Sequence, residues 1–365
     1  MTITVAFRTD ASSTIGSGHV FRCLTLADAL KAKGANCHFF CRNYPGHLLD
    51  VIRHRGHTGT VISVGAEDSS ASDHTFPQAS DYAWQMDARQ SLEAMEKLRP
   101  DWLIVDHYGI DHRWEEALQL HDCKIMVIDD LADRKHACHL LLDQNLGRSH
   151  EDYRTRVTKH CTVLTGPNFA LMRPEFSEQR AWSLRRRQDC QAFGHLLIAM
   201  GGVDAPNASC KVLQVLKTCS LPPESRITVV MGLKAQWIKE VRHLAGGMPW
   251  PTEVVVNVDD MAVRMGTSDL AIGAAGITSW ERCCMGLPAM LIVLAQNQEH
   301  GAKALEAAGA ADLIGRVSDI EAKLPLAFKS LMNVAVRSSM STRASAIADG
   351  GGVRRVLEAM ALNNV

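Results

Sequence analysis

The sequence has no excess of either charge and no long apolar run, and each absence excludes a class of protein. Lys and Arg number 39 against 40 Asp and Glu, which gives a net charge of −1. General binding of nucleic acid needs a dense basic surface, so we expect no nucleic-acid partner, although a local anion pocket is compatible with this balance. A transmembrane helix needs about 18 or more consecutive apolar residues, and no apolar run is that long. We therefore expect no membrane partner.

The cysteines form no pattern that indicates disulfides or zinc. Eleven are scattered over 365 residues without a Cys-x-x-Cys pair, and the amino-terminal segment lacks the basic region of a signal peptide. An odd number of cysteines without a secretion signal indicates reduced thiols, so we expect a cytoplasmic protein. The zinc motif His-Glu-x-x-His is also missing, and the sequence predicts neither a metal nor another cofactor.

Apolar runs typical of strands alternate with helical patterns almost throughout, which indicates an α/β fold with parallel sheets. In the first half the expected strands are Ile3–Thr9, Cys37–Arg42, Val61–Val64, Trp102–Asp106, Ile125–Asp129, Leu140–Asp143 and Thr162–Thr165. In the second half they are His195–Met200, Ile227–Met231, Val254–Val258, Leu270–Gly273 and Met290–Leu294. After about Ala310 the pattern predicts only helices that complete the second domain.

The length and the two series of strands predict two domains. A polar segment without a strand pattern separates the two series, and it contains the run Arg185–Arg187, which we interpret as a solvated face. We expect a Rossmann-like domain over residues 1–175, a linker over 176–193 and a second Rossmann-like domain over 194–365. Open parallel sheets bind ligands at the carboxyl ends of their strands, so we expect both domains to face a common cleft there.

The loop after the first strand combines glycines with a histidine. Gly16 and Gly18 permit a sharp turn and close approach to a ligand. The third glycine of a dinucleotide-binding fingerprint is missing, since Phe21 stands in its place. His19 lies at the start of the expected helix, whose positive end favours the neutral imidazole that a general base requires. A histidine that only packs or lies at the surface is the alternative.

Acidic residues follow two later strands. Asp106-His107-Tyr108 ends one strand and Asp129-Asp130 ends another. Carboxylates at these ends point into the ligand crevice of a parallel sheet, where they could orient His19, bind hydroxyl groups or hold a metal. An Asp that caps the next helix or turn is an equally good interpretation.

The second half has two glycine-rich strand ends. Gly201 and Gly202 follow its first strand, and the segment Asp269–Arg282 has the pattern of a strand, a turn of small residues and a helix. The free N–H groups of that helix, from about Gly276 to Ser279, would bind a diphosphate with help from the Thr278 hydroxyl. Glu281, one turn further, could accept hydrogen bonds from a ribose. An ordinary tight strand–helix turn is the alternative.

Taken together, these motifs resemble a known family. Glu281, Gly286 and Pro288 resemble the nucleotide-binding signature of the GT-B glycosyltransferases, particularly the MurG-like group. With Arg8-x-Asp10 and Gly16-x-Gly18-His19-x-x-Arg22, the sequence resembles the PseG family, the UDP-2,4-diacetamido-2,4,6-trideoxy-β-L-altropyranose hydrolases of pseudaminic acid biosynthesis. The other supporting motifs are Asp129-Asp130-Leu131, Leu142-Asp143-Gln144-Asn145, Arg173-Pro174-Glu175-Phe176, Gly201-Gly202-x-Asp204-x-x-Asn207 and Asn297-Gln298.

The resemblance implies a GT-B fold, a UDP-sugar substrate, no metal and a catalytic histidine at His19. We expect water to attack the anomeric carbon opposite UDP, with inversion. Besides His19, the expected catalytic residues are Asp10 and Tyr108. The residues expected to bind substrate are Arg8, Gly16, Gly18, Arg22, Asp106, Asp130, Asn145, Gly201, Gly202, Asn207, Met231, Gly232, Ala275, Gly276, Thr278, Glu281, Asn297 and Gln298.

Three other functions fit the same motifs. A MurG-like glycosyltransferase would have the same second domain, with an acceptor groove in the first. A UDP-sugar 2-epimerase would use carboxylates for proton transfer, and a sugar-nucleotide sensor would bind without turnover. The sequence makes no prediction about protein partners.

Overall fold

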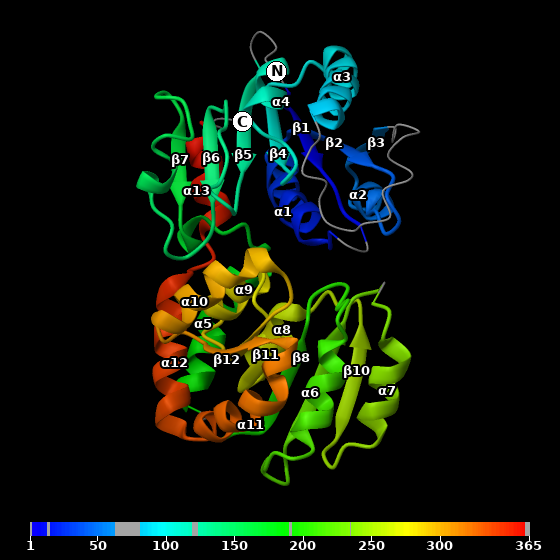
Figure 1. Cartoon of the computed structure of the whole chain (residues 1–365). Coiled ribbons are helices and arrows are strands. Elements are labelled where there is room, and N and C mark those ends of the chain that lie inside the picture. The colour runs from blue at the N-terminus through cyan, green and yellow to red at the C-terminus, as the bar shows by residue number, and fades with distance from the viewer. Residues whose placement is uncertain are drawn as a thin grey trace. The chain divides into compact units, whose positions relative to one another are not determined.

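The computed structural model describes residues 2–12, 15–62, 81–118, 123–189, 192–233 and 235–361. The chain forms two compact units. The first contains the chain up to Leu171 together with the segment from Gly352 onward, and the second extends from Met172 to Gly351. Figure 1 labels the elements of both.

The first unit contains a seven-stranded parallel sheet with the strand order β3-β2-β1-β4-β5-β6-β7. Its order reverses direction between β1 and β4, which makes their carboxyl ends the point where doubly wound sheets bind ligands. The strands are β1 (Thr4–Thr9), β2 (Asn36–Arg42), β3 (Thr58–Ile62), β4 (Trp102–Asp106), β5 (Lys124–Ile128), β6 (Leu140–Asp143) and β7 (Thr162–Thr165).

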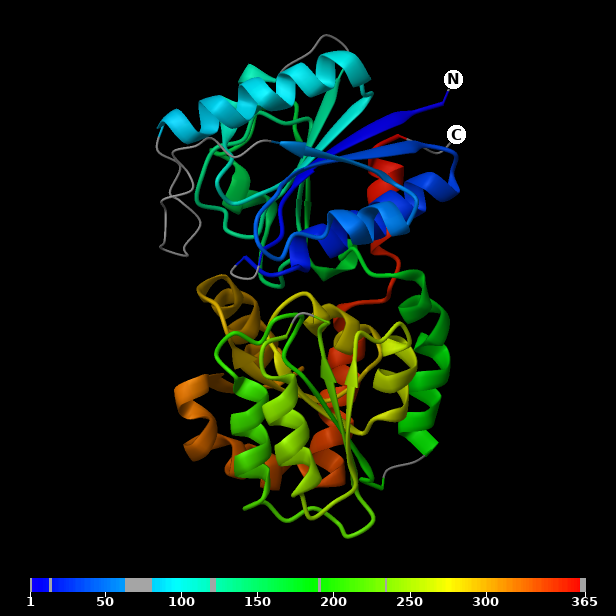
Figure 2. The same cartoon turned by 90° about the vertical axis from the view of Figure 1, so that its right-hand side faces the viewer.

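Helices cover both faces of this sheet because its strands are apolar on both sides. Val5 and Phe7 of β1 pack in one core cluster with α1, α2 and α13, whereas Ala6 between them packs in another with α3 and α4. Figure 2 shows α3 in cyan on one side of the sheet and α1 in blue on the other. The helices are α1 (Gly18–Ala32), α2 (Leu49–His54), α3 (Asp81–Leu98), α4 (His112–Ala117) and α13 (Gly352–Ala359), with the 3₁₀ turns η2 (His150–Tyr153) and η3 (Pro167–Phe169).

The second unit contains a six-stranded parallel sheet in the order β10-β9-β8-β11-β12-β13. The strands are β8 (His195–Ala199), β9 (Arg226–Met231), β10 (Thr252–Val256), β11 (Leu270–Ala274), β12 (Ala289–Val293) and β13 (Asp312–Arg316). The helices are α5 (Pro174–Asp189), α6 (Ala208–Leu216), α7 (Ile238–Gly246), α8 (Met261–Thr267), α9 (Thr278–Cys284), α10 (Glu299–Ala307), α11 (Ile320–Leu331) and α12 (Val334–Ile347), with the 3₁₀ turns η4 (Gln296–Gln298) and η5 (Val317–Asp319).

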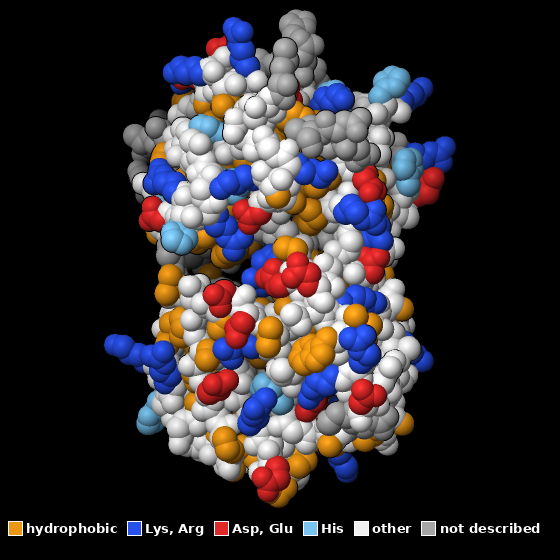
Figure 3. Space-filling model, turned by 180° about the vertical axis from the view of Figure 1, so that it is seen from behind, with side chains coloured by type: hydrophobic (Ala, Val, Ile, Leu, Met, Phe, Trp, Pro, Cys, Tyr) orange, Lys and Arg blue, Asp and Glu red, His pale blue; other side chains and the backbone are white. Residues whose placement is uncertain are grey.

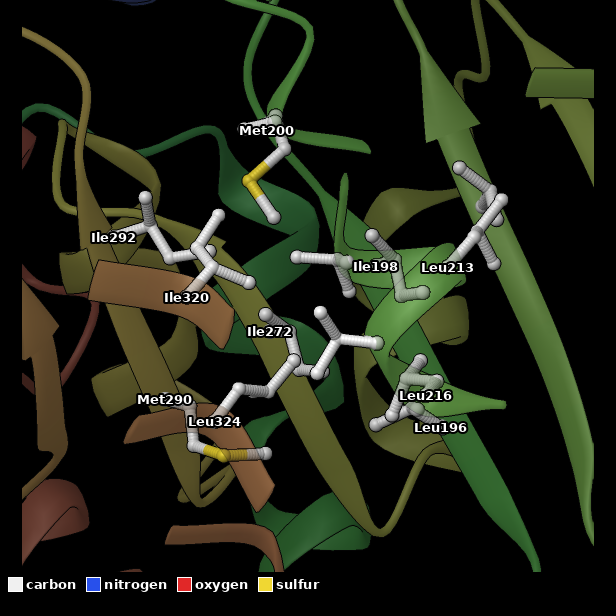
Figure 4. Packing of buried hydrophobic residues seen from close by; sticks show 14 of the residues in the cluster. Leu196, Ile198, Met200, Leu213, Leu216, Ile272, Met290, Ile292, Ile320 and Leu324 are labelled. Carbon is white, nitrogen blue, oxygen red and sulfur yellow. The ribbon is translucent and has the colours of Figure 1, made fainter. Parts of the chain in front are cut away.

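The core of the second unit joins the central strands to α6 and α11. Ile198 of β8 and Ile272 of β11 pack with Leu213 of α6 and with Ile320 and Leu324 of α11, and all five are fully buried. Figure 4 shows these side chains in one cluster over the sheet. On the face shown in Figure 3, positive and negative side chains are intermingled. No helix in the described part of the chain has the length and apolar character of a membrane span.

The α/β class is confirmed, and the bounds of the expected strands agree with the observed ones to within about three residues. The last two residues of the expected strand Val61–Val64 lie outside the described residues. The prediction of only helices after Ala310 is wrong, because Asp312–Arg316 forms β13 at the sheet edge. The segment has few apolar residues, so it lacks the pattern of a buried strand.

The borders of the units differ from the expected ones. Most of the segment expected as a linker forms α5, which belongs to the second unit. Arg187 of this helix donates hydrogen bonds to the carbonyls of Met265, Ser268 and Met285, at 2.6, 2.7 and 3.1 Å. Arg187 therefore binds the carbonyl ends of neighbouring helices, and Arg186 pairs with Asp269 at 2.7 Å, which explains polar residues in a packed helix.

Candidate functional site

His19 lies at the carboxyl edge of the first sheet, in the first turn of α1. Its Nδ1 is 2.6 Å from Oδ1 of Asp106, the last residue of β4. Only 7% of His19 is exposed, and Asp106 is completely buried. The ring of Tyr108 meets the imidazole edge-on, with 4.6 Å between the ring centroids.

Arg22, one turn further along α1, links this pair to a second carboxylate. Its Nε and Nη2 donate to the two oxygens of Asp106, both at 2.6 Å. Its Nη1 and Nη2 donate to the two oxygens of Asp130 at 2.9 and 2.8 Å. Asp130 in turn accepts a hydrogen bond from the Tyr108 hydroxyl at 2.7 Å. We call these five residues, His19, Arg22, Asp106, Tyr108 and Asp130, the His19 cluster.

The electrostatics of the cluster determine the state of the imidazole. Burial by itself raises the pKa of Asp106, but the charge of Arg22 and the hydrogen bonds from Arg22 and His19 hold it well below its usual range. Asp106 is therefore ionised at neutral pH, and we assign the ring proton of His19 to Nδ1, facing this carboxylate. That tautomer leaves Nε2 as the basic nitrogen, the arrangement that a general base requires.

Asn145 connects the cluster to a buried group of carboxylates. Its Nδ2 lies 2.8 Å from Oδ1 of Asp143 and 3.3 Å from the carbonyl of Asp130. The Tyr153 hydroxyl lies 2.7 Å from Asp143 and 2.9 Å from Asp129. Burial and the nearby Asp130 raise the pKa of Asp143 to about 7. One phenol hydrogen cannot serve two ionised carboxylates, which agrees with a proton on Asp143.

Arg8 and Asp10 lie in a separate buried network. Arg8 pairs with Asp10 at 2.9 Å and with Asp87 of α3 at 2.6 Å, and the two side chains of the motif are 0% and 1% exposed. Asp10 also accepts from the backbone N–H of Arg42 at 2.7 Å and lies 3.3 Å from Nε2 of His107. Both side chains are buried, and their contacts are with Asp87 of α3, the backbone of Arg42 and His107.

Asp87 was not expected from the sequence. It accepts hydrogen bonds from Arg8, Arg42 and the indole N–H of Trp114, all within 3.1 Å. Because these charges surround it, its pKa lies well below the usual range, against the opposing effect of burial. No sequence signal marks it, since it lies within a polar helix and not at a strand end.

The glycines of the first loop turn the chain into α1. Gly16 has φ +84°, and its N–H donates to the carbonyl of Ser12 at 3.0 Å, so the loop closes on itself. Gly18 is the first residue of α1. The turn thus brings His19 to the edge where β4 and β5 end.

In the second unit the loops after β8 and β9 touch through their glycines. Gly201 has φ +80°, and any side chain on Gly232 would collide with the backbone of Gly202. Asp204 accepts from the first N–H groups of α6 at 2.8 and 2.9 Å, so a carboxylate already occupies that helix start. Met231 is buried in the core, so its expected substrate contact could come only from its backbone.

The turn between β11 and α9 has a buried cation behind it. Nη2 of Arg282, whose residue is 2% exposed, donates to the carbonyl of Ala274 at 2.6 Å and to Oγ of Ser279 at 2.9 Å. Nη1 lies 3.3 Å from Oγ1 of Thr278. A Cβ on Gly273 would collide with this guanidinium, which explains a glycine within β11. Burial lowers the pKa of Arg282 to about 10, so it remains charged at neutral pH.

Other expected residues surround the same turn. The side-chain nitrogen of Gln298 lies 3.6 Å from the position of a Cβ on Gly276, and its oxygen accepts from the N–H of Leu294 at 2.9 Å. Among the described residues, the Glu281 carboxylate has no hydrogen-bond partner, and burial raises its pKa. Ala275 is buried and continues the sheet by donating to Ile292 at 3.0 Å.

Two expected residues belong to neighbouring elements. Asn297 lies in η4, beside Gln298. Asn207 precedes α6 with φ +56°, and its Oδ1 is buried without a hydrogen bond in the described structure. In the first unit the structure joins His19, Arg22, Asp106, Tyr108, Asp130 and Asn145, whereas Arg8 and Asp10 lie in a separate network.

Comparisons with other proteins identify relatives at low identity, and no family model matches the chain. An uncharacterized protein of Methanocaldococcus jannaschii is 26% identical over 80% of this chain, and a UDP-2,4-diacetamido-2,4,6-trideoxy-β-L-altropyranose hydrolase of Campylobacter jejuni is 28% identical over 58%. The matches span 56% and 65% of those two proteins. The spore coat polysaccharide biosynthesis protein SpsG of Bacillus subtilis is 23% identical over 93% of both chains.

Solved structures resemble the whole chain. MurG of Acinetobacter baumannii has a TM-score of 0.72 at 18% identity, and the match covers 99% of both chains. A UDP-GlcNAc 2-epimerase of Neisseria meningitidis has a TM-score of 0.62 at 11% identity, over 100% of both chains. With its parallel sheets of seven and six strands, the chain therefore has the GT-B fold.

Proposed function

We propose that this protein hydrolyses a UDP-linked 2,4-diacetamido-2,4,6-trideoxy sugar to UDP and the free sugar, as a step of pseudaminic acid biosynthesis in the cytoplasm. The observation that carries the proposal is the pair of His19 Nδ1 and Asp106 Oδ1 at 2.6 Å, which presents an oriented imidazole at the ligand-binding edge of a sheet. The hydrolase of Campylobacter jejuni, 28% identical over 58% of the chain, supports the choice of substrate.

In this proposal the second unit binds the UDP portion. The turn between β11 and α9 would hold the diphosphate, because its N–H groups and the charge of Arg282 both favour an anion. The start of α6 is a poorer phosphate site, since the Asp204 carboxylate occupies it. Glu281, without a hydrogen-bond partner among the described residues, would accept hydrogen bonds from the ribose.

The first unit would supply the chemistry. Nε2 of His19 takes a proton from water while the water oxygen forms a bond to the anomeric carbon. The bond from that carbon to the β-phosphate oxygen breaks, and its electron pair leaves with UDP. Asp106 stabilises the imidazolium that forms, and donors at the diphosphate stabilise the charge on the leaving group. Attack opposite UDP gives inversion, and no step requires a metal.

Incubation with candidate UDP-sugars tests the proposal. Phosphorus and proton NMR should show UDP and free sugar in equal amounts, with the same rate in EDTA. Transfer of the sugar to an added acceptor would indicate a glycosyltransferase, and a changed sugar still linked to UDP would indicate an epimerase. Binding without any product would indicate a sensor.

A MurG-like glycosyltransferase is the second candidate. The structure most similar in fold among those described above is MurG, with a TM-score of 0.72 over 99% of both chains. Because proteins with one fold catalyse many reactions, this similarity shows the architecture only. The incubation with UDP-sugars decides whether the acceptor is water or another sugar.

A further inference from the structure

Arg22 has its hydrogen-bonding capacity directed into the protein. A guanidinium has five N–H donors in one plane, and the Arg22 group forks onto Asp106 on one side and Asp130 on the other, with four contacts of 2.6–2.9 Å. The residue is 2% exposed. A group held in this way cannot approach a substrate phosphate, although its charge and its place in a Gly-x-Gly-His-x-x-Arg motif suggest that role.

We propose that Arg22 is a positioning residue, which acts on His19 through Asp106 and Tyr108 and makes no contact with substrate. The inference rests on the proposed general-base role of His19. It replaces the expectation that Arg22 binds substrate.

The first route is through Asp106. Oδ1 of this carboxylate faces both Nδ1 of His19 and Nη2 of Arg22, each at 2.6 Å, and Nη2 lies 3.3 Å from Nδ1. The carboxylate therefore orients the ring while the guanidinium balances its charge. The positive charge of Arg22 therefore lies beside both the imidazole and the carboxylate that orients it.

The second route is through Asp130. Arg22 fixes this carboxylate, which accepts the Tyr108 hydroxyl at 2.7 Å, and the Tyr108 ring packs edge-on against His19. The Arg22 guanidinium thus holds Asp106, which accepts a hydrogen bond from Nδ1 of His19. Through Asp130 it also holds the Tyr108 ring that packs against the imidazole. A lysine has one compact ammonium group and cannot make both forks.

Removal of the guanidinium should change the pH dependence of the reaction. Among the described residues, the titratable and charged groups in contact with this pair and its supports include Arg22 and Cys23 of α1, Tyr108 after β4 and Asp130 after β5. Without Arg22, two carboxylates lie near the imidazole with no balancing charge, which favours its protonated form. The fraction of active base at neutral pH then falls, and it recovers as the pH is raised.

The test compares Arg22→Gln and Arg22→Lys with the wild-type chain. We expect kcat at pH 7 to fall about tenfold or more in Arg22→Gln, KM and UDP affinity to stay within about threefold, and the acid limb of the pH–rate profile to move up by about one pH unit. Arg22→Lys should recover only part of the rate. A raised KM, weakened UDP binding and an unmoved pH profile would instead show that Arg22 binds substrate.

Arg134→Gln is the matched control. Arg134 is another partly buried arginine of the first unit, paired with Asp129 at 3.0 Å and outside the His19 cluster. Its loss should lower stability without a change in the pH profile. A shift of equal size in this variant would mean that the effect in Arg22→Gln is general destabilisation, and the inference would fail.

Nitrogen NMR of histidine-labelled protein separates this inference from the proposed reaction. The His19 signals, assigned with His19→Gln, should show a neutral ring with hydrogen on Nδ1 at pH 7 in the wild type and a largely protonated ring in Arg22→Gln. Identical His19 spectra in the two proteins would overturn the positioning role. Changed spectra in a protein that hydrolyses no UDP-sugar would uphold it and reject the proposed function.

Discussion

At the scale of residues, the proposed general-base role of His19 depends on the carboxylate of Asp106. Asp106 is completely buried, and both its oxygens are engaged by His19 and Arg22. Its effect on turnover must therefore pass through the imidazole. Tyr108 after the same strand and Asp130 after β5 complete the support of the ring.

Asp106→Asn should remove that effect while leaving substrate binding intact. The amide carries no charge to stabilise an imidazolium and can present N–H to Nδ1, which favours the wrong tautomer. We expect kcat to fall about 10²-fold or more with KM within about threefold, measured by steady-state kinetics. Circular dichroism provides the control for folding, and a folded variant with wild-type kcat would contradict the role of Asp106.

Asp143 should make the protein less stable as pH rises. Its pKa is raised to about 7 by burial and Asp130, from an ordinary value of about 3.9, so the folded state holds a proton that the unfolded state releases. The contribution of this proton to the free energy of unfolding is fully present below about pH 4 and is lost as the pH rises to 7. Urea denaturation at pH 5 and pH 8 should show the loss in the wild type and a smaller one in Asp143→Asn. Equal losses in both proteins would refute the assignment.

The sequence could predict those site residues that lie at strand ends. The carboxyl ends of neighbouring parallel strands meet at one edge, so Asp106 and Asp130 were expected near His19, and the structure brings them together. It could not show that Arg8 and Asp10 are buried, because their partner Asp87 lies 79 residues from Arg8 in a polar helix. Partners at such separation leave no local pattern.

At the scale of elements, buried strands were predictable and edge or polar elements were not. Leu140–Asp143 was expected with its observed bounds because three consecutive leucines form a clear apolar run that ends at a carboxylate. β13 has only one completely buried residue, Ile314. In α5, Arg180 and Arg187 donate hydrogen bonds to backbone carbonyls. Both elements depend on tertiary contacts, which outweigh local propensity.

The turn between β11 and α9 provides a prediction at this scale. Gly273→Ala places a methyl group against Arg282 and the carbonyl of Ala199, so the guanidinium must move from behind the turn. We expect lower stability and weaker UDP binding, measured by thermal unfolding and calorimetry. Gly246→Ala, which adds a methyl group with no neighbour within 4 Å, is the matched control and should bind UDP normally. A folded Gly273→Ala variant with normal UDP affinity would show that the position of Arg282 does not matter for nucleotide binding.

At the scale of the whole molecule, the chain returns to its first unit at the end. Val356 and Leu357 of α13 lie in the same core cluster as Val5, Leu24 and Phe39. The last helix therefore completes the first sheet's packing, although the sequence pattern assigns it to the second domain. Because each unit has its own sheet and core, the two should unfold as separate cooperative blocks.

Val356→Asp tests this assignment. The Val356 side chain is fully buried, so a carboxylate there should lower the melting temperature of the first unit and leave that of the second unit unchanged. Calorimetry measures the two transitions, and hydrogen exchange assigns each of them to a unit. Glu358→Ala on the exposed side of α13 should change neither transition. Destabilisation confined to the second unit would contradict the observed division.

The GT-B fold supports transfer, epimerisation and hydrolysis, so the fold alone does not identify the reaction. The central claim is that water attacks the anomeric carbon and that the bond from this carbon to the β-phosphate oxygen breaks. The most direct measurement is phosphorus NMR of UDP formed from the UDP-diacetamido sugar in ¹⁸O-labelled water. We predict UDP without label, because the bond between the anomeric carbon and oxygen breaks, at a rate about 10²–10⁴-fold lower in His19→Gln. Label in the β-phosphate, or an undiminished rate in that variant, would contradict it.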